Sequence, residues 1–262
     1  MAEIIKNANV DLQAIILAGG RGSRMGDYTR EHQKCMLEVD GAPIIQHILS
    51  GLRDTFGTRL EIIIATGYRG SEIKSYFGDT YEGMKLVYVH DERPLETRGR
   101  MMLAKDLLVK PFLFLAGDIL TPNSILTQLV ARFESEKRKN NSTVGVISGA
   151  KDHSPALSHA VLTVSNGFLQ NIVYPPPMEY NSEDLRESHR AIYSLDFLEM
   201  ACQSNEKLLS KVIKEIIAET NKNFGIESFS GTWGHYITPT DLERYKDLPF
   251  LKKGGRVLYE DR

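Results

Sequence analysis

Short apolar strands alternate with helical stretches through the first half of this chain, and this alternation most restricts its fold. Strands are predicted at 12–17, 60–65, 84–89 and 111–116, and helices at 43–52, 71–77 (capped by Ser71), 97–108 and 123–139. Strand–helix–strand units of this length need crossover connections, which make the strands parallel and place helices on both faces of the sheet. The pattern predicts an α/β, Rossmann-like three-layer sandwich.

From about residue 143 the elements become shorter and the sheet is expected to be mixed. Strands are predicted at 144–148, 159–164, 168–173, 189–193, 226–229 and 232–237, and helices at 195–203, 208–220 and 241–246, the last capped near Thr240. No linker, low-complexity tract or internal repeat separates the two halves. Residues 1–262 are therefore expected to form one domain.

Composition excludes several classes of protein. The 32 Lys and Arg residues nearly balance the 34 Asp and Glu residues, which argues against a nucleic-acid binder. The two cysteines, Cys35 and Cys202, are far apart, so neither a disulfide framework nor a cysteine zinc site is expected. The longest apolar runs are five residues, whereas a membrane-spanning helix needs about 20. With a polar start that lacks a signal peptide, the chain is expected to be cytoplasmic.

The loop after the first predicted strand, LAGGRGSRM at 17–25, is rich in glycine and arginine. Adjacent glycines let the backbone approach a ligand closely, and N–H groups at a helix start form an anion cradle. Arg21 and Arg24 would add charge-assisted contacts to phosphates. The spacing matches neither the P-loop nor the dinucleotide fingerprint. A glycine-rich turn with two solvated arginines is the alternative.

A second polar segment, Gly117-Asp118, follows the fourth predicted strand. In open parallel sheets, ligands bind at the carboxyl ends of the strands, where both segments are expected to lie. This edge of the sheet is the candidate functional site.

The stretch LAGGRGSRM, followed by KCMLEVDGAP at 34–43, resembles the signature of the sugar-1-phosphate nucleotidyltransferases. Segments 65–69, 73–78, 91–104 and 116–118 are also similar, so the resemblance covers nearly all of the first 120 residues. It implies a GT-A-like nucleotidyltransferase fold, with a nucleotide-binding half at about 12–140 and an acceptor-binding half at about 141–250. It also implies transfer of a nucleoside monophosphate from an NTP to a sugar 1-phosphate or similar phosphorylated acceptor, with release of pyrophosphate.

The resemblance assigns roles to individual residues. Arg24 would clamp the phosphates, Lys34 would neutralise them during attack, and Asp118 would bind the divalent cation, Mg²⁺ or alternatively Mn²⁺. The implied nucleotide-binding residues are Leu17, Ala18, Gly19, Gly20, Arg21, Gly22, Ser23, Glu92, Glu96 and Thr97. Taken without the resemblance, Lys34 would be a surface lysine and Asp118 a cap of the following turn.

Several positions depart from the family pattern. The family closes its site with Trp-x-Asp-x-Gly-Thr-Pro, but here His235 replaces that aspartate, the second metal ligand. Neutral imidazole binds Mn²⁺ or Zn²⁺ better than Mg²⁺, which makes His235 a candidate metal ligand; a histidine that only fills the space is the alternative. The Glu-Lys-Pro that grips the sugar phosphate reads VYPP at 173–176, and Glu96 replaces a glycine of the nucleotide side. The sugar-contacting Asn-x-Gly-x-Tyr reads HRAIY at 189–193, which makes Arg190 and Tyr193 the candidate acceptor-binding residues.

The phosphate-binding residues match the family pattern, whereas the second metal ligand and the residues that grip the sugar phosphate do not. Two functions follow from this difference. The intact phosphate-binding residues favour an active nucleotidyltransferase with an unusual acceptor. His235 and Glu96 favour a catalytically weak or inactive nucleotide-binding homologue with a regulatory or assembly role. The expected partners are an NTP and a phosphorylated sugar, with a homo-oligomer left open and no membrane or nucleic acid.

Overall fold

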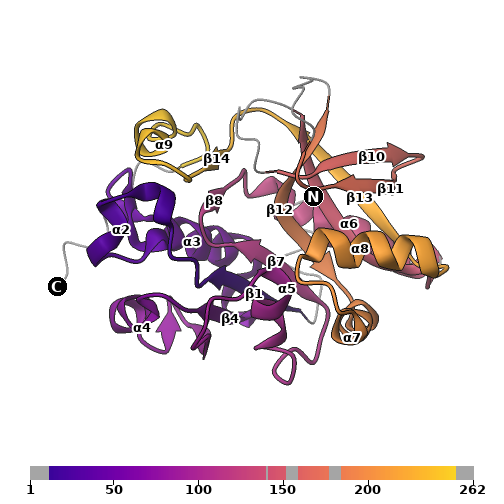
Figure 1. The fold of residues 1–262 in the computed structure, drawn as a ribbon, viewed down its shortest axis with the longest axis horizontal. Coiled ribbons are helices and arrows are strands. Elements are labelled where there is room, and N and C mark those ends of the chain that lie inside the picture. The colour runs from indigo at the N-terminus through magenta and orange to yellow at the C-terminus, as the bar shows by residue number, and fades with distance from the viewer. Residues whose placement is uncertain (1–11, 140, 152–158, 177–183, 252–262) are drawn as a thin grey trace.

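The computed structural model describes residues 12–139, 141–151, 159–176 and 184–251. A ten-stranded mixed sheet forms the centre of the fold (Figure 1). Its first half contributes β1 (Gln13–Ala18), β4 (Glu61–Thr66), β5 (Thr80–Tyr81), β6 (Met84–His90) and β7 (Phe112–Ala116). Its second half contributes β9 (Thr143–Lys151), β10 (Val161–Ser165), β11 (Phe168–Val173), β12 (Leu185–Tyr193) and β13 (Asn223–Ser230). The strand order is β10-β11-β13-β9-β12-β7-β1-β4-β6-β5.

Strand direction changes between the two halves, as the change of pattern near residue 143 predicts. β1 lies between β4 and β7 and is parallel to both, and β6 is parallel to β4. β12 is antiparallel to its neighbours β7 and β9. The carboxyl ends of β1, β4, β6 and β7 therefore meet at one edge of the sheet, where the candidate site is expected.

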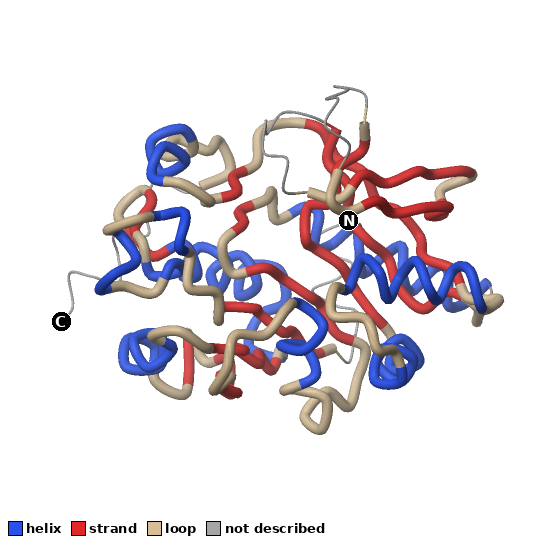
Figure 2. Tube along the Cα trace, in the orientation of Figure 1, coloured by secondary structure: helices blue, strands red, loops and turns tan. Residues whose placement is uncertain are grey.

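Helices cover both faces of the sheet (Figure 2). One face packs on α3 (Ile44–Phe56), α4 (Gly70–Phe77) and α6 (Ser124–Lys139), and the other on α5 (Thr97–Met102), α7 (Leu195–Gln203) and α8 (Leu209–Glu219). Within β1, Ile16 joins the first core and Ile15 the second, because successive strand residues point to opposite faces. The predicted three-layer sandwich is confirmed.

Several predicted boundaries are wrong. The helix expected over 97–108 ends at Met102 and continues as tight turns, and α4 begins after Arg69 rather than with a Ser71 cap. The late strand shrinks to β14 (Gly234–His235). The closing helix is α9 (Pro239–Arg244), whose cap is Thr238 rather than Thr240.

Elements of two to four residues went unpredicted because so few residues show no periodicity. They are α2 (Tyr28–Glu31), β2 (Glu38–Val39), β3 (Ala42–Pro43), β5, β8 (Ile119–Leu120) and the 3₁₀ turns η1 (Ser23–Met25), η2 (Lys34–Met36) and η3 (Gly57–Arg59). Among the described helices, none combines the length and the apolar character that crossing a membrane requires. The expected lack of a signal peptide concerns residues 1–11, which lie outside the described residues.

An aromatic cluster lies in the core between the sheet and the helices α5, α7 and α8. Tyr193 of β12 stacks on Phe197 with ring centroids 4.0 Å apart, and Phe224 packs edge-on against both rings. These rings approach the main chain of β9 at Gly145, where a Cβ would lie 2.6 Å from Tyr193 Cδ1. A side chain at 145 would therefore force the cluster apart.

We expect Gly145→Ala to lower the free energy of unfolding by about 1–3 kcal/mol, the usual cost of overpacking a core. Gly20→Ala is the control, because a Cβ at Gly20 meets nothing within 4 Å. Urea unfolding of both variants measures the effect. Equal stability of the two proteins would contradict this account of the cluster.

Candidate active site

Asp118 lies in a tight turn between β7 and β8 that is tied to two other parts of the fold. The N–H of Gly117 donates to the carbonyl of Leu17 at 2.9 Å, and the carbonyl of Asp118 accepts from the N–H of Tyr236 at 3.0 Å. β8 pairs antiparallel with β14, which carries His235. A Cβ at position 117 would lie 2.9 Å from both Cys35 Sγ and the Leu17 carbonyl, so the turn needs glycine there.

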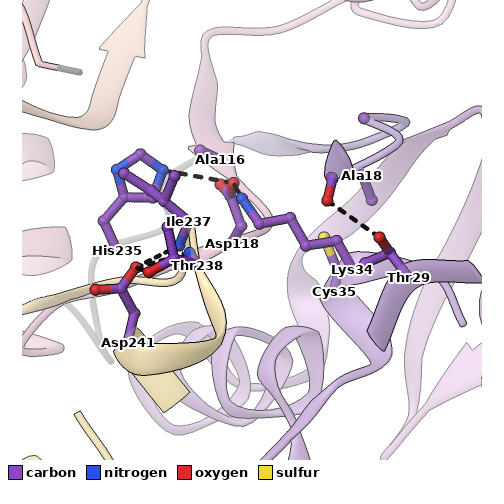
Figure 3. A network of polar contacts seen from close by, with 12 residues as sticks. Ala18, Thr29, Lys34, Cys35, Ala116, Asp118, His235, Ile237, Thr238 and Asp241 are labelled. Atoms are coloured by element: carbon purple, nitrogen blue, oxygen red, sulfur yellow. Dashed lines mark hydrogen bonds and ion pairs between the residues drawn. The ribbon is translucent and has the colours of Figure 1, made fainter. Parts of the chain in front are cut away.

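The carboxylate of Asp118 is the meeting point of the site (Figure 3). Lys34 extends from η2 and its Nζ donates to Oδ2 of Asp118, while His235 Nε2 lies 3.5 Å from the same oxygen. Burial by itself would raise the pKa of Asp118, but the charge of Lys34 and the hydrogen bonds from His235 and Lys34 outweigh it and hold that pKa well below its usual range. Asp118 is therefore ionised at neutral pH.

A cluster of three histidines adjoins this carboxylate through His235. His235 Nδ1 is 2.8 Å from His159 Nε2, and the His159 and His189 ring centroids are 5.3 Å apart. Burial, followed by the charges of His235 and His189, lowers the pKa of His159 well below its ordinary value. Burial also lowers the pKa of His235, against the opposing pull of Asp118. Both His159 and His235 are thus neutral at pH 7.

Asp118 lies in the wall of a small cavity beside a larger groove. The cavity has a volume of about 200 Å³, and its polar lining includes Lys34, Asp118, His189 and His235. The groove has a volume of about 1040 Å³ and follows the loops after β1, β4 and β6. Gly20 and Arg100 line both spaces, so the two adjoin. A ligand with a bulky part in the groove and a phosphate in the cavity would fit this arrangement.

Two polar contacts shape the glycine loop. Gln33 Nε2 donates to the carbonyl of Ala18 at 2.7 Å, which ties the loop to the segment that carries Lys34. Arg100 Nε donates to Asp91 Oδ2 at 2.9 Å, and a Cβ at Gly19 would lie 2.5 Å from that same Nε. The absent side chain at Gly19 thus lets Arg100 lie against the loop.

A family model described as nucleotidyl transferase matches residues 13–158. The chain belongs to this family. Among curated relatives, a UTP–glucose-1-phosphate uridylyltransferase of Haloferax volcanii is 30% identical over 107 residues, 41% of this chain and 43% of the relative. The bifunctional protein GlmU of Methanococcus maripaludis is 29% identical over 257 residues, 94% of this chain and 57% of the relative. The chain spans about half the length of the curated relatives it matches.

Solved structures share the fold. A UDP-glucose pyrophosphorylase complexed with UDP-glucose superposes with a TM-score of 0.74 at 16% identity, covering 97% of this chain and 100% of its own. The inositol-1-phosphate CTP transferase from T. maritima gives a TM-score of 0.69 at 14% identity, covering 92% of this chain and 98% of its own. The predicted nucleotidyltransferase fold is confirmed.

The structure brings most of the site residues predicted from the sequence to the two spaces. Those at the cavity are Leu17, Ala18, Gly20, Lys34, Thr97, Asp118 and His235, and those at the groove are Gly19, Gly20, Arg21, Glu92 and Glu96. Gly22, at φ 66°, packs against the stem of Lys34. Ser23 and Arg24 are exposed in η1 and line neither space.

The two predicted acceptor-binding residues do not reach the cavity. Tyr193 lies in the aromatic core, where burial and then the charge of Glu187 raise the pKa of its hydroxyl well above the ordinary value. Arg190 is 2% exposed and donates to main-chain carbonyl groups. On this geometry neither side chain contacts a ligand in the cavity.

Sequence reasoning missed His159, His189 and Arg100 as residues of the site. The sequence does hold a signal for His189, because this residue stands where the family has the asparagine of its sugar-contacting strand. Arg100 lies in a segment that resembles the family but matches none of its motif residues. Nothing around His159 signals a site, because only the fold brings it beside His235, 76 residues later in the chain.

The lowered pKa of His159 predicts a pH-dependent stability. The unfolded chain takes up a proton near pH 6.5 that the folded ring resists, so stability falls as pH drops below that value, by at most about 1.4 kcal/mol per pH unit for one group. Urea unfolding between pH 8 and pH 5 measures this for wild type and His159→Gln. The wild type should lose more stability than the variant over this range, and parallel curves would contradict a neutral, buried His159.

Proposed function

We propose that the protein transfers a nucleoside monophosphate from an NTP to a sugar 1-phosphate or a similar phosphorylated acceptor and releases pyrophosphate. The observation that carries the proposal is the Lys34–Asp118 pair at the carboxyl edge of the parallel strands, beside the glycine loop. In the reaction, an acceptor phosphate oxygen bonds to the α-phosphorus as the bond from that phosphorus to pyrophosphate breaks. Such a transfer depends on alignment and charge neutralisation more than on proton transfer.

The groove and the cavity supply these needs from different residues. The groove takes the base and ribose, with Glu92 and Glu96 as carboxylate acceptors along its wall. The cavity takes the reacting phosphates, where the ammonium of Lys34 offsets their negative charge. The rings of His189 and His235 offer polar contacts on the acceptor side.

Among the described residues, the cavity offers too few ligands for a divalent cation by itself, and it fits one whose coordination is completed by the substrate. Asp118 offers a carboxylate and His235 an imidazole nitrogen, but the described residues hold no group of three or more His, Cys, Asp or Glu able to bind a metal alone. The remaining ligands would come from phosphate oxygens and water, as is usual for nucleotide-bound cations. A bound cation would neutralise phosphate charge, and the imidazole favours Mn²⁺ over Mg²⁺.

The second candidate is a nucleotide-binding homologue with little or no transferase activity. The observation that favours it is His235, a neutral ring where the family has the second metal-binding carboxylate.

Our proposal also includes a nucleotide-binding half at about 12–140, an acceptor-binding half at about 141–250, and a cytoplasmic location. It leaves self-association open.

Pyrophosphate release, measured with each of four NTPs against a panel of sugar phosphates, tests the proposed function. With the best pair, Asp118→Asn should lower kcat by about 10²–10³-fold, because it removes the charge that the cation and Lys34 meet. The control is Asp106→Asn, at an exposed carboxylate that lines neither the cavity nor the groove. An Asp118→Asn protein with full activity would remove this residue from the reaction.

His235→Asp separates the two candidate functions. A restored carboxylate should raise Mg²⁺-supported turnover relative to Mn²⁺-supported turnover, because hard oxygen ligands suit Mg²⁺. His235→Gln is the matched variant, since its amide cannot supply the carboxylate charge. If wild type and His235→Asp are both inactive with every metal while still binding nucleotide by calorimetry, the homologue without transferase activity is the better description.

A further inference from the structure

The guanidinium of Arg190 is buried directly under the turn that carries Asp118. Its Nη1 donates to the carbonyl of Ala116 at 2.9 Å and to that of His189 at 3.3 Å, and its Nη2 donates to the carbonyl of Ile119. The first and last of these carbonyls flank Gly117 and Asp118 on either side. One rigid side chain therefore bridges both ends of the turn.

A bulge in β12 makes this placement possible. The pairing of β12 with β9 shifts between Glu187 and Ala191, and His189 has a left-handed φ of 52°. Ser148 of β9 holds the bulge by donating its hydroxyl to the Arg190 carbonyl at 2.8 Å. Bulges redirect side chains that a regular strand would point elsewhere. Here His189 lines the cavity while Arg190 lies beneath the β7–β8 turn.

We propose that Arg190 is a positioning residue, which holds the Gly117-Asp118 turn so that the Asp118 carboxylate faces the cavity. The inference rests on the proposed function of the site. It assigns Arg190 a role through Asp118 rather than through contact with the acceptor.

Two physical arguments support this role. A guanidinium presents several N–H donors in a fixed plane, so it can join carbonyls on both sides of a turn, which a lysine ammonium cannot do in the same geometry. Burying a cation costs free energy unless it is hydrogen-bonded and paired. Burial lowers the pKa of Arg190 to about 9, and the negative charge of Asp118 opposes that shift, which places the guanidinium within the field of the carboxylate.

The same strand offers a matched control. Arg186 is also buried in β12, but its Nη2 lies 3.2 Å from Asp184 Oδ2, and it makes no hydrogen bond to the Asp118 turn among those observed in the described residues. Losing either arginine removes one buried cation from β12. Only the loss of Arg190 removes the support of Asp118.

The experiment compares Arg190→Met, Arg190→Lys and Arg186→Met with wild type in pyrophosphate release. For both Arg190 variants we expect kcat to fall about 10–100-fold and the Mn²⁺ concentration for half-maximal activity to rise by a similar factor, as when a residue that orients a metal ligand is lost. The KM for nucleotide should stay within about two-fold, since the groove is unchanged. Arg186→Met should keep both kcat and the Mn²⁺ requirement.

Hydrogen–deuterium exchange of a peptide covering residues 116–121 gives a readout that does not depend on activity. Exchange in Arg190→Met should be at least about ten-fold faster than in wild type and in Arg186→Met, because the turn opens more often. If Arg190→Met does not fold, the same measurements on Arg190→Lys decide the role of Arg190, because lysine keeps the positive charge but lacks the planar set of N–H donors. Unchanged exchange and kcat, or equal losses in Arg186→Met, would overturn the proposal. A wild type without activity would refute the proposed function, while the exchange result would still decide the role of Arg190.

Discussion

The contact between Lys34 and Asp118 is the interaction on which the rest of the site depends. A carboxylate recessed in a cavity is stable only if cations and hydrogen-bond donors replace the water it has lost. Lys34 reaches it from η2, His235 from β14, and Arg190 supports its turn from β12. Lys34 and Asp118 lie in the first half of the chain and His235 and Arg190 in the second, so segments from both halves must be in place together.

The same arrangement explains where this chain departs from its family. Around the carboxylate of Asp118 the site places the ammonium of Lys34 and the neutral imidazole of His235, so the cavity is less negative than one with two carboxylates. The acceptor side is correspondingly rich in histidine, with His159 behind His235 and His189 at the bulge of β12. A neutral imidazole ring both donates and accepts hydrogen bonds, so it can bind a polar acceptor substrate without a second metal-bound carboxylate.

Much of the fold could be predicted because the strands and helices are strongly periodic. β11 and α7 have the predicted bounds, and β1, β4, β6 and β7 lie within one or two residues of them. β8 was not predicted, and the strand predicted at 232–237 is reduced to β14, because these two strands are formed by pairing with each other rather than by a local preference. The shift of the last cap to Thr238 has a local cause: Asp241 accepts from the N–H groups of Ile237 and Thr238, so the helix begins at Pro239.

The sequence by itself determined the layered α/β architecture, the glycine loop and the pairing of that loop with Asp118, because periodicity and turn chemistry are local properties of the chain. Only the tertiary structure decided which polar side chains face the cavity. Arg190 and His189 are neighbours in sequence, yet the bulge sends one under the Asp118 turn and the other toward the ligand space. The direction of a side chain at a bulge depends on the partner strand, and the partner of β12 lies some 40 residues away in the chain, as the contact of Ser148 with Arg190 shows.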